Sequence, residues 1–452
     1  MNITRISFLL SLVLSAISAG ATVICGTVSD AESNEELIGA SVKIDGTSIG
    51  AVTDIDGRYS INVKPGTYSI TASYVGFSAL TQSDIIASAD TIVVDFALLI
   101  EQQTLGEVSV TAVARRNNQE HMQIEGGPTT IHGGTNDADN SGIYQYVRIE
   151  FAGYPFDTDK EINGLTLGSV GSGTTIDHIQ VSYSNDDSFE WFGGSVNCNY
   201  LVAYKGWDDD FDTDNGFSGR VEYCLAVRDP RIADTSQSNS FESDNNAGGA
   251  ETTPFTSALF SHVTLIGPMT AKNTDFVNSS DFITAGQLFP DNGSKLGKFQ
   301  AALQIRRGSK LGASHLLAVG FPIGLIVDGE KGNTVKYAQN GKLTFDNILF
   351  AGMSIIGSDK NKLYEDHLYD FATGVEDPNQ QSYSHTFFSS IPSNAIATEA
   401  SLGLTDLAGV GQNYCPTTEI SDGKGGYIGA FRNAADNWLA GWTNFDPQNT
   451  IY

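Results

Sequence analysis

Eight carboxylates crowd the stretch from residue 186 to residue 214, and Lys205 is the one cation among them. The eight are Asp186, Asp187, Glu190, Asp208, Asp209, Asp210, Asp212 and Asp214. Like charges this close repel one another in a folded chain, so water must separate them or a cation must neutralise them. Carboxylate oxygens are preferred ligands of Ca²⁺. The stretch therefore predicts a calcium site or, as the alternative, a solvated acidic face.

The spacing of the acids does not match an EF-hand. Asp210, Asp212 and Asp214 have the alternation of that calcium loop. Gly216 and Glu222, however, each fall one position later than the loop requires. We expect calcium to bind instead among acids that recur in successive sequence repeats. These candidate ligands are Glu190, Asp210, Asp212, Asp214, Glu242 and Asp244.

Aromatic residues accompany the acids and could bind sugars. The faces of Trp and Tyr stack on sugar rings because they combine apolar area with a polar edge. The candidates are Trp191, Trp207, Tyr183 and Tyr204. The same residues could equally pack between loops, so a glycan-binding groove is one of two interpretations.

Catalysis would require a base or a second acid beside these carboxylates. In a calcium-dependent polysaccharide lyase, the metal acidifies a uronate proton and a basic side chain removes it. The candidate bases are Lys205, Arg228 and Arg231. A hydrolase would use two carboxylates, and the sequence selects no pair. We expect a non-catalytic binding protein and keep the lyase as the alternative.

The composition argues against a nucleic-acid partner and favours an all-β protein. The 452 residues have a formal net charge of −28 and no basic stripe, whereas phosphate binding needs Lys and Arg gathered on one face. Only 17% of the residues are charged and 48 are Gly, which is typical of a chain with many turns. Four Cys are too few for a disulfide scaffold. Cys198 and Cys224 lie in successive repeats and could form a disulfide or stay as buried thiols.

The first 21 residues predict export. Arg5 precedes an apolar run at 6–17, and small residues follow at 19–21, as in a cleaved secretory signal. The run is shorter than the roughly 20 residues that span a bilayer, and we expect no transmembrane segment in the mature chain.

Residues 22–106 alternate apolar and polar side chains in short runs separated by Gly, Asp and Asn, which predicts a small β-sandwich. The run GTVSDAESNEELIGASVKIDGTSIGAVTDIDGRYSINVKPGTYSITASYVGF resembles the carboxypeptidase-regulatory-like, transthyretin-type sandwich found before TonB-dependent outer-membrane transporters. EVSVTAVARRN, at 107–117, resembles the segment that leads such receptors into their plug domain. No plug or barrel strands follow, so the resemblance implies an accessory or adhesive module and not transport.

The rest of the chain is quasi-periodic. Aligning Ile179 with Leu201 and Leu225 gives spacings of 22 and 24 residues. Val181, Ala203 and Val227 keep the same alignment. Repeats of this length, each with one short apolar strand, predict a right-handed parallel β-helix, a pectate-lyase-like solenoid that buries each coil on the next.

The alignment also predicts columns of side chains on coils about 4.8 Å apart. Phe189, Phe211 and Phe241 form one column, and Glu190, Asp212 and Glu242 form the next. Asp214 and Asp244 form a third. Carboxylates in such a column need a cation between them or raised pKa values.

Residues 143–268 and 441–448 resemble a group of poorly characterised secreted β-helix proteins, which implies the fold without a transferable activity. The expected organisation is a signal peptide (1–21), a sandwich (22–106), a linker and solenoid cap (107–142), a parallel β-helix (143–362) and C-terminal coils with a cap (363–452). We expect a protein of the periplasm, outer-membrane surface or cell exterior that binds calcium and a polysaccharide or another surface component. An accessory role in TonB-dependent uptake, in association with an outer-membrane transporter, is a further alternative.

Overall fold

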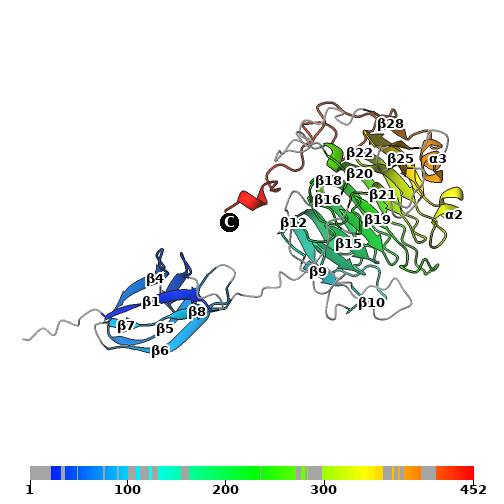
Figure 1. Cartoon of the computed structure of the whole chain (residues 1–452). Helices are drawn as coiled ribbons and strands as arrows, with labels where there is room; N and C mark the ends of the chain where they lie inside the picture. Colours follow the sequence, from blue (N-terminus) through cyan, green and yellow to red (C-terminus); the bar gives the residue numbers. More distant parts are fainter. Residues whose placement is uncertain are drawn as a thin grey trace, which may run out of the picture. The chain divides into compact units, whose positions relative to one another are not determined.

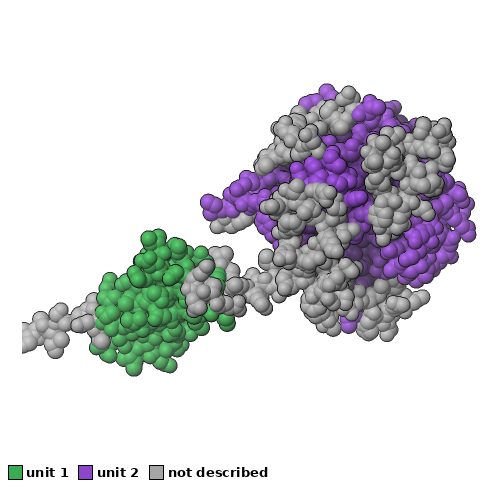
Figure 2. All heavy atoms as spheres, in the orientation of Figure 1, with its two compact units in different colours: residues 1–104 green, residues 105–452 purple. Residues whose placement is uncertain are grey.

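The chain folds into two compact units, residues 1–104 and 105–452, each described by itself (Figures 1 and 2). The computed structural model describes residues 22–31, 36–47, 49–74, 77–88, 91–99, 108–111, 122–124, 131–153, 162–234, 236–270, 276–279, 282–283, 298–359, 369–370, 375–376, 381–398 and 414–451. The predicted signal peptide, 1–21, lies outside these residues.

The first unit is a β-sandwich, as predicted. One sheet has the order β4-β1-β7, with β8 also pairing β1, and the other has the order β3-β2-β5-β6. The strands are β1 (Thr22–Asp30), β2 (Ser41–Ile44), β3 (Gly50–Val52), β4 (Arg58–Val63), β5 (Gly66–Ser73), β6 (Leu80–Ala87), β7 (Thr91–Val93) and β8 (Phe96–Leu98). In β4 the side chains of Tyr59, Ile61 and Val63 are buried and those between them are exposed. This alternation of period two fills the core between the sheets.

The second unit is a parallel β-helix built from two eight-stranded parallel sheets (Figure 1). The long-strand sheet contains β12 (Ile143–Glu150), β14 (Thr175–Ser182), β16 (Asn197–Tyr204), β18 (Arg220–Val227), β20 (Leu259–Ile266), β22 (Gly312–Val319), β24 (Thr344–Ala351) and β28 (Ala395–Ala397). The short-strand sheet contains β9 (Val108–Thr111), β13 (Leu165–Gly168), β15 (Phe189–Phe192), β17 (Phe211–Asp214), β19 (Phe241–Ser243), β21 (Ala301–Ile305), β23 (Ile323–Val327) and β25 (Ile355–Ser358). From β12 to β25 the chain alternates between the two sheets, so strands pair with the next coil and not with their neighbours in sequence.

Shorter elements complete the fold. They are β10 (Met122–Gln123) paired with β11 (Ile131–His132), β26 (Tyr369–Asp370) paired with β27 (Val375–Glu376), the 3-10 helices η1 (Pro268–Thr270) and η3 (Pro447–Asn449), and the helices α2 (Thr334–Gln339) and α3 (Tyr383–Ser389). β9 pairs with β13 and so adds a strand to the β-helix from within the expected linker and cap. Within the described part of the chain, no helix combines the length and apolar character needed to cross a membrane.

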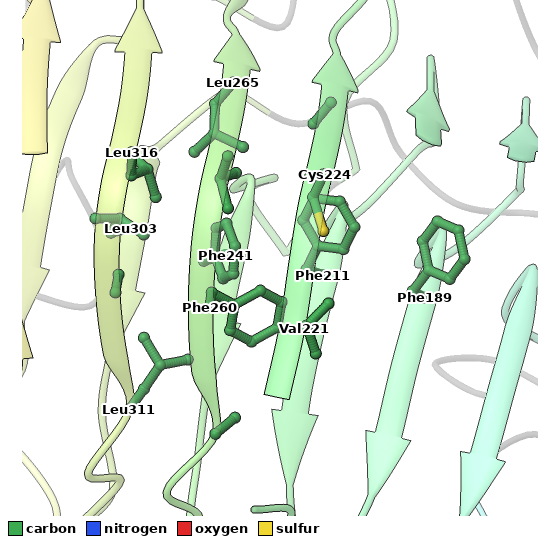
Figure 3. Close-up of a cluster of buried hydrophobic side chains, with 14 of the residues drawn as sticks. Phe189, Phe211, Val221, Cys224, Phe241, Phe260, Leu265, Leu303, Leu311 and Leu316 are labelled. Carbon is green, nitrogen blue, oxygen red and sulfur yellow. The ribbon is translucent and has the colours of Figure 1, made fainter. Parts of the chain in front are cut away.

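The predicted column of phenyl rings lies inside the β-helix. Phe189 pairs with Phe211, and Phe211 with Phe241, on successive strands of the short-strand sheet. The ring centroids are 5.6 and 5.2 Å apart, and Phe260 from the long-strand sheet packs edge-on against Phe241 (Figure 3). These fully buried rings fix the stacking of the coils that carry the acids.

The alignment of the third coil in the long-strand sheet was wrong by one residue. Leu201 pairs with Cys224, not with Leu225, so Ala203 pairs with Ala226, not with Val227. The reason is that each long strand contains a residue in the left-handed conformation, such as Tyr200 and Tyr223 (φ 57° and 60°), which interrupts the two-residue alternation. After the left-handed residue, apolar side chains occur on both faces of the strand, so they do not show which face points into the core.

The register also separates the two thiols. Cys198 pairs with Val221, and Cys224 lies opposite Leu201, so the two Cys occupy different positions on their strands. Both are free and buried. Of the two states that the sequence left open, the structure has the buried thiols.

The C-terminal segment, residues 414–451, covers the outer face of the long-strand sheet. It packs against apolar residues from several coils, from Tyr204 to Ala351. Beside them, the left-handed residues form an outer ladder of stacked rings, with centroids 4.4 to 5.2 Å apart. Its rings are Tyr146, His178, Tyr200, Tyr223, His262 and His315. Trp438 and Trp442 pack edge-on against this ladder, so the C-terminal segment covers part of the outer face of the sheet.

Candidate metal centre

The acids lie where each coil turns from a long strand into a short strand. In this turn the Asp209 N–H donates to Asp187 Oδ1 at 2.8 Å, one coil below. The Asn239 N–H donates to Asp209 Oδ1 in turn, and the Ala301 N–H donates to Asn239 Oδ1. Side-chain oxygens thus accept backbone hydrogen bonds from the following coil, which fixes the positions of Asp187 and Asp209.

The predicted acidic column forms beside this turn. Glu190 pairs with Asp212, and Asp212 with Glu242, on β15, β17 and β19. Strand alternation places these residues on the face opposite the phenyl rings. Thr166 precedes the column and Gln304 follows it, so the charges are confined to the middle coils.

Three carboxylates converge at the lower end of the column. Ligand oxygens of Asp187, Glu190 and Asp212 all lie within 4.8 Å of one another, which we call the inner triad. Asp187 is 7% and Glu190 5% exposed. Two oxygens on opposite sides of a calcium ion are about 5 Å apart, so one ion could contact all three residues.

An amide oxygen accompanies the inner triad. Asn163 is 2% exposed, and its Nδ2 donates to Glu190 Oε2 and to Thr166 Oγ1. Its Oδ1 is buried and has no hydrogen-bond partner, and neither has Oδ1 of Asp212. Buried polar atoms without partners are rare because desolvation is costly. Both are hard oxygen donors of the kind that Ca²⁺ accepts.

A second group shares one member with the first. Ligand oxygens of Asp186, Asp187 and Asp208 also lie within 4.8 Å of one another, and we call this group the outer triad. Asp186 and Asp208 are partly exposed. The two triads therefore meet at Asp187.

The protein environment disfavours ionised carboxylates in this region. Burial raises the pKa of Asp187 well above its ordinary value, and the carboxylates of Asp186 and Asp209 raise it further. Burial and then neighbouring carboxylates raise the pKa values of Asp208 and Asp212 in the same way. Burial also raises the pKa of Asp209 to about 7. A bound cation would reverse this by stabilising the charged forms.

Three of the predicted ligands have built-in cations instead. Asp210 pairs with Arg228 at 3.0 Å, and both side chains are fully buried. Glu242 pairs with Arg306. Asp244 pairs with Arg306 at 2.8 Å and with Arg307 at 2.7 Å. Arginines therefore already compensate the charge of these three predicted ligands.

The residues that the structure brings together differ in part from the predicted ligands. Asp214 accepts hydrogen bonds from the backbone and side chain of Asn215 and belongs to neither triad. Glu190 and Asp212 alone persist from the prediction. Asp187 joins them in the inner triad, and Asn163 contacts Glu190 through its Nδ2. Only the stacking of coils could have identified these two, since neither belongs to the repeated acidic column.

The structure places most of the predicted sugar-binding aromatics in the protein interior. Trp191 lies inside the β-helix, stacked on Phe217 at 5.3 Å. Tyr204 lies beneath the C-terminal segment, and Trp207 packs in a separate apolar cluster with Ile232. Tyr183 is partly buried between the rings of Phe151 and Tyr204. The four residues therefore line no common groove.

Two other rings, which the sequence did not single out, are exposed. Tyr146 is 62% exposed at the end of the outer ladder, and Phe151 is 46% exposed and stacks on Tyr183. Tyr146 belongs to β12, which is the terminal strand of the long-strand sheet, and Phe151 directly follows this strand. The pattern IYQYVRIEF contains them, but nothing local marks the end of the solenoid.

The three candidate bases have structural contacts. Lys205 pairs with Asp229 at 3.2 Å. Burial alone would lower the pKa of Lys205, but the charge of Asp229 and the nearby tyrosine hydroxyls raise it above its ordinary value. Arg228 is buried with Asp210, and Arg231 lies over the ring of Phe282 at 3.7 Å. A general base needs a lowered pKa and access to substrate, so these contacts do not support the lyase.

Comparison with known proteins identifies the solenoid. A family model described as a pectate-lyase like β-helix domain matches residues 67–384. The chain belongs to this β-helix family. A carboxypeptidase regulatory-like domain model matches residues 23–99. The two matches overlap at 67–99, where β5 to β8 pair within the sandwich, so the strands of the β-helix itself begin at β9.

Similarity to individual proteins is confined to short stretches. A TonB-dependent receptor of Formosa agariphila is 43% identical over 72 residues, which are 16% of this chain and 7% of the receptor. An Acetivibrio cellulolyticus type II cohesin–X-dockerin complex has a TM-score of 0.15 at 22% identity, covering 17% of this chain and 56% of that chain. A Bacteroides uniformis protein described as carbohydrate binding has a TM-score of 0.16 at 16% identity, covering 24% and 49%. At these TM-scores the structural likenesses carry no argument for this β-helix protein.

Proposed function

We propose that the protein is an exported, non-catalytic binding protein of the cell envelope whose β-helix holds calcium. The observation that carries the calcium site is the inner triad of Asp187, Glu190 and Asp212 with the unpaired oxygen of Asn163. Among the described residues Asp187 and Asp212 form no ion pair. Burying carboxylates without a compensating cation costs several kcal/mol. A calcium ion supplies that compensation.

The ligand set favours calcium over magnesium. Calcium accepts six to eight oxygens in flexible geometry, including carboxylates, amide carbonyls and waters. Magnesium needs a near-ideal octahedron about 2.1 Å in radius. The inner triad has two Asp and one Glu side chain, and the amide of Asn163 accompanies it. Because these residues come from stacked coils, the spacing of the strands sets their geometry, and an ideal octahedron is not expected. Two of the three carboxylates, Asp187 and Glu190, are buried, so we expect the inner ion to stabilise the fold.

The first unit supports a location at the envelope. It is a carboxypeptidase regulatory-like sandwich, and the TonB-dependent receptor shares a short stretch of sequence with this chain. We propose that the protein acts at the outer membrane or cell surface, alone or with a transporter. The candidate bases are engaged in ion pairs or packing, which supports binding without catalysis.

A polysaccharide is the partner class that we propose. The support is the pair of exposed rings, Tyr146 and Phe151, at the end of the β-helix. Mobility in native gels that contain uronate or neutral polysaccharides measures such binding. Retardation should weaken in Tyr146→Ala with Phe151→Ala and persist in Tyr337→Ala, whose ring lies elsewhere beside Phe255. Equal retardation of both variants would remove these rings from the site.

Thermal unfolding tests the calcium site. Full-length protein is freed of metal with chelator and melted with and without calcium. A ligand at a hundred times its Kd adds about 2.7 kcal/mol to the free energy of unfolding, so the midpoint should rise. The rise should shrink in Glu190→Gln with Asp212→Asn and persist in full in Glu242→Gln, whose partner is Arg306. An unchanged midpoint in the unmutated protein would contradict the proposal.

A further inference from the structure

Resting on the proposed calcium site, we infer that the turn binds two calcium ions bridged by Asp187, one in the inner triad and one in the outer triad. The outer ion would contact Asp186, Asp187 and Asp208, whose ligand oxygens lie within 4.8 Å of one another. These residues come from two stacked turns. The Trp207 N–H donates to Ser184 O at 2.9 Å, which holds the turns together.

Asp208 supplies an independent sign of a ligand. Its Oδ2 accepts from Ser236 Oγ at 2.6 Å, whereas its Oδ1 is buried and has no hydrogen-bond partner. Leaving a buried oxygen of a charged group unpaired costs more free energy than leaving a neutral one unpaired. A cation in the outer triad would give this oxygen a partner.

The nearest arginine does not meet this need. Arg228 Nη1 donates to the backbone oxygen of Asp208 at 2.6 Å and to Asp210 Oδ1 at 3.0 Å. Its Nη2 donates to the backbone oxygen of Trp207 at 3.1 Å. Arg228 therefore fixes the main chain of the turn and neutralises Asp210. It forms no ion pair with the carboxylate of Asp208.

Asp187 is able to bridge two ions. A carboxylate offers about four lone-pair positions, and the hydrogen bond from the Asp209 N–H uses one of them. That bond also fixes the orientation of Asp187 between the two triads. Paired metal ions in proteins lie about 3.5–4 Å apart, a separation that a shared carboxylate can span.

The charge balance favours two ions. The two triads together contain five carboxylates. One calcium ion balances two of these charges, and two ions balance four. Beside the shared Asp187, the inner triad has one buried residue, Glu190, whereas Asp186 and Asp208 of the outer triad are both partly exposed. We expect a tight inner ion and a weaker outer ion that keeps water in its open coordination positions.

Counting bound ions tests the pair. Equilibrium dialysis with radioactive calcium on the metal-free, full-length protein should give two ions per chain with different affinities. Asp186→Asn with Asp208→Asn should keep the tight ion and lose the weak one. Glu242→Gln is the matched control and should bind two. Melting curves with calcium check that each variant is folded.

The outcomes separate this inference from the proposed function. One tight ion in the unmutated protein, unchanged in Asp186→Asn with Asp208→Asn, overturns the second ion and leaves the first. No bound ion overturns both. Two ions that both persist in that variant place the second ion elsewhere and also overturn the inference.

Discussion

The two ends of the acidic face compensate their charge in different ways. At the upper end Glu242 and Asp244 pair with Arg306 and Arg307, which belong to the next coil. At the lower end the inner triad has oxygens within 4.8 Å of one another, and neither Asp187 nor Asp212 forms an ion pair within the described ranges. Glu242 lies one coil above Asp212 in the same column. Equivalent positions thus differ in whether the protein supplies the cation.

This difference separates structural acids from candidate ligands. The charge of a carboxylate that pairs with a buried arginine is already neutralised by the protein. Removing the arginine leaves an uncompensated buried charge. A carboxylate without one raises the free energy of the folded state until a proton or a metal ion arrives. Asp212 and Glu242 are carboxylates at equivalent positions on adjacent coils, so the arginines decide the role.

The largest expected effect comes from breaking the fully buried pair. Arg228→Met leaves Asp210 buried and charged, and it also removes hydrogen bonds to the backbone oxygens of Trp207 and Asp208. We expect the free energy of unfolding to fall by about 3–5 kcal/mol, measured by urea denaturation. Arg228→Met with Asp210→Asn should regain part of the loss. A double variant no more stable than the single one would show that the charge of Asp210 is not the cause.

The pH dependence tests the acids that lack built-in cations. The pKa of Asp209 is about 7 in the fold, against about 3.9 in an unfolded chain. Between these values the native state holds a proton that the unfolded state has lost, so stability falls as the pH rises. In chelator we expect a loss of about 3 kcal/mol from pH 5 to pH 8. Urea denaturation at both values measures it.

Two comparisons make this prediction specific. Asp209→Asn should reduce the pH dependence in chelator, because one of the titrating groups is gone. Saturating calcium should reduce the loss at pH 8, where the carboxylates are ionised and bind metal best. Stability that rises from pH 5 to pH 8 in chelator would contradict the raised pKa values.

The sequence revealed those parts of the site that repeat locally. Phe189, Phe211 and Phe241 recur beside an acid on short strands, so one alignment predicted both the core column and the acidic column. The register of the long strands was harder to predict from the sequence. Left-handed residues such as Tyr200 interrupt their alternation, and the C-terminal segment buries their outer face. Apolar residues therefore occur on both sides and do not fix the register.

The partners of the acids could not be found from local patterns. Arg306 lies 64 residues after Glu242, beyond a long insertion between two coils. Only the pairing of β19 with β21 brings them together. The burial of Trp191 and Tyr204 could not be predicted for a related reason. A Trp or Tyr among acids has the same sequence context whether its side chain points inward or outward.

Removing Arg306 should leave the upper carboxylates without most of their compensating charge, as at the lower end. Arg306→Gln leaves Glu242 and Asp244 with Arg307 alone as a cation. We expect a loss of about 2 kcal/mol in chelator and a smaller loss in calcium, because the ion can replace the guanidinium. Arg432→Gln is the control, since its pair with Glu419 is exposed and contributes less than about 1 kcal/mol. Equal losses with and without calcium would show that the freed acids bind no metal.

The smallest expected effect is a change in the free energy of unfolding that has opposite signs in two variants. Asp212→Asn and Glu242→Gln each neutralise one carboxylate in adjacent coils of one column. In chelator the first should raise the free energy of unfolding by about 1 kcal/mol, because burial and neighbouring acids hold the pKa of Asp212 well above its ordinary value. The second should lower it by about 1 kcal/mol, because Arg306 loses a charged partner. In calcium, Asp212→Asn should become the less stable of the two, since it alone removes a ligand. Urea denaturation in both solutions measures this reversal, and two variants that shift in the same direction in chelator would erase the distinction between the ends of the column.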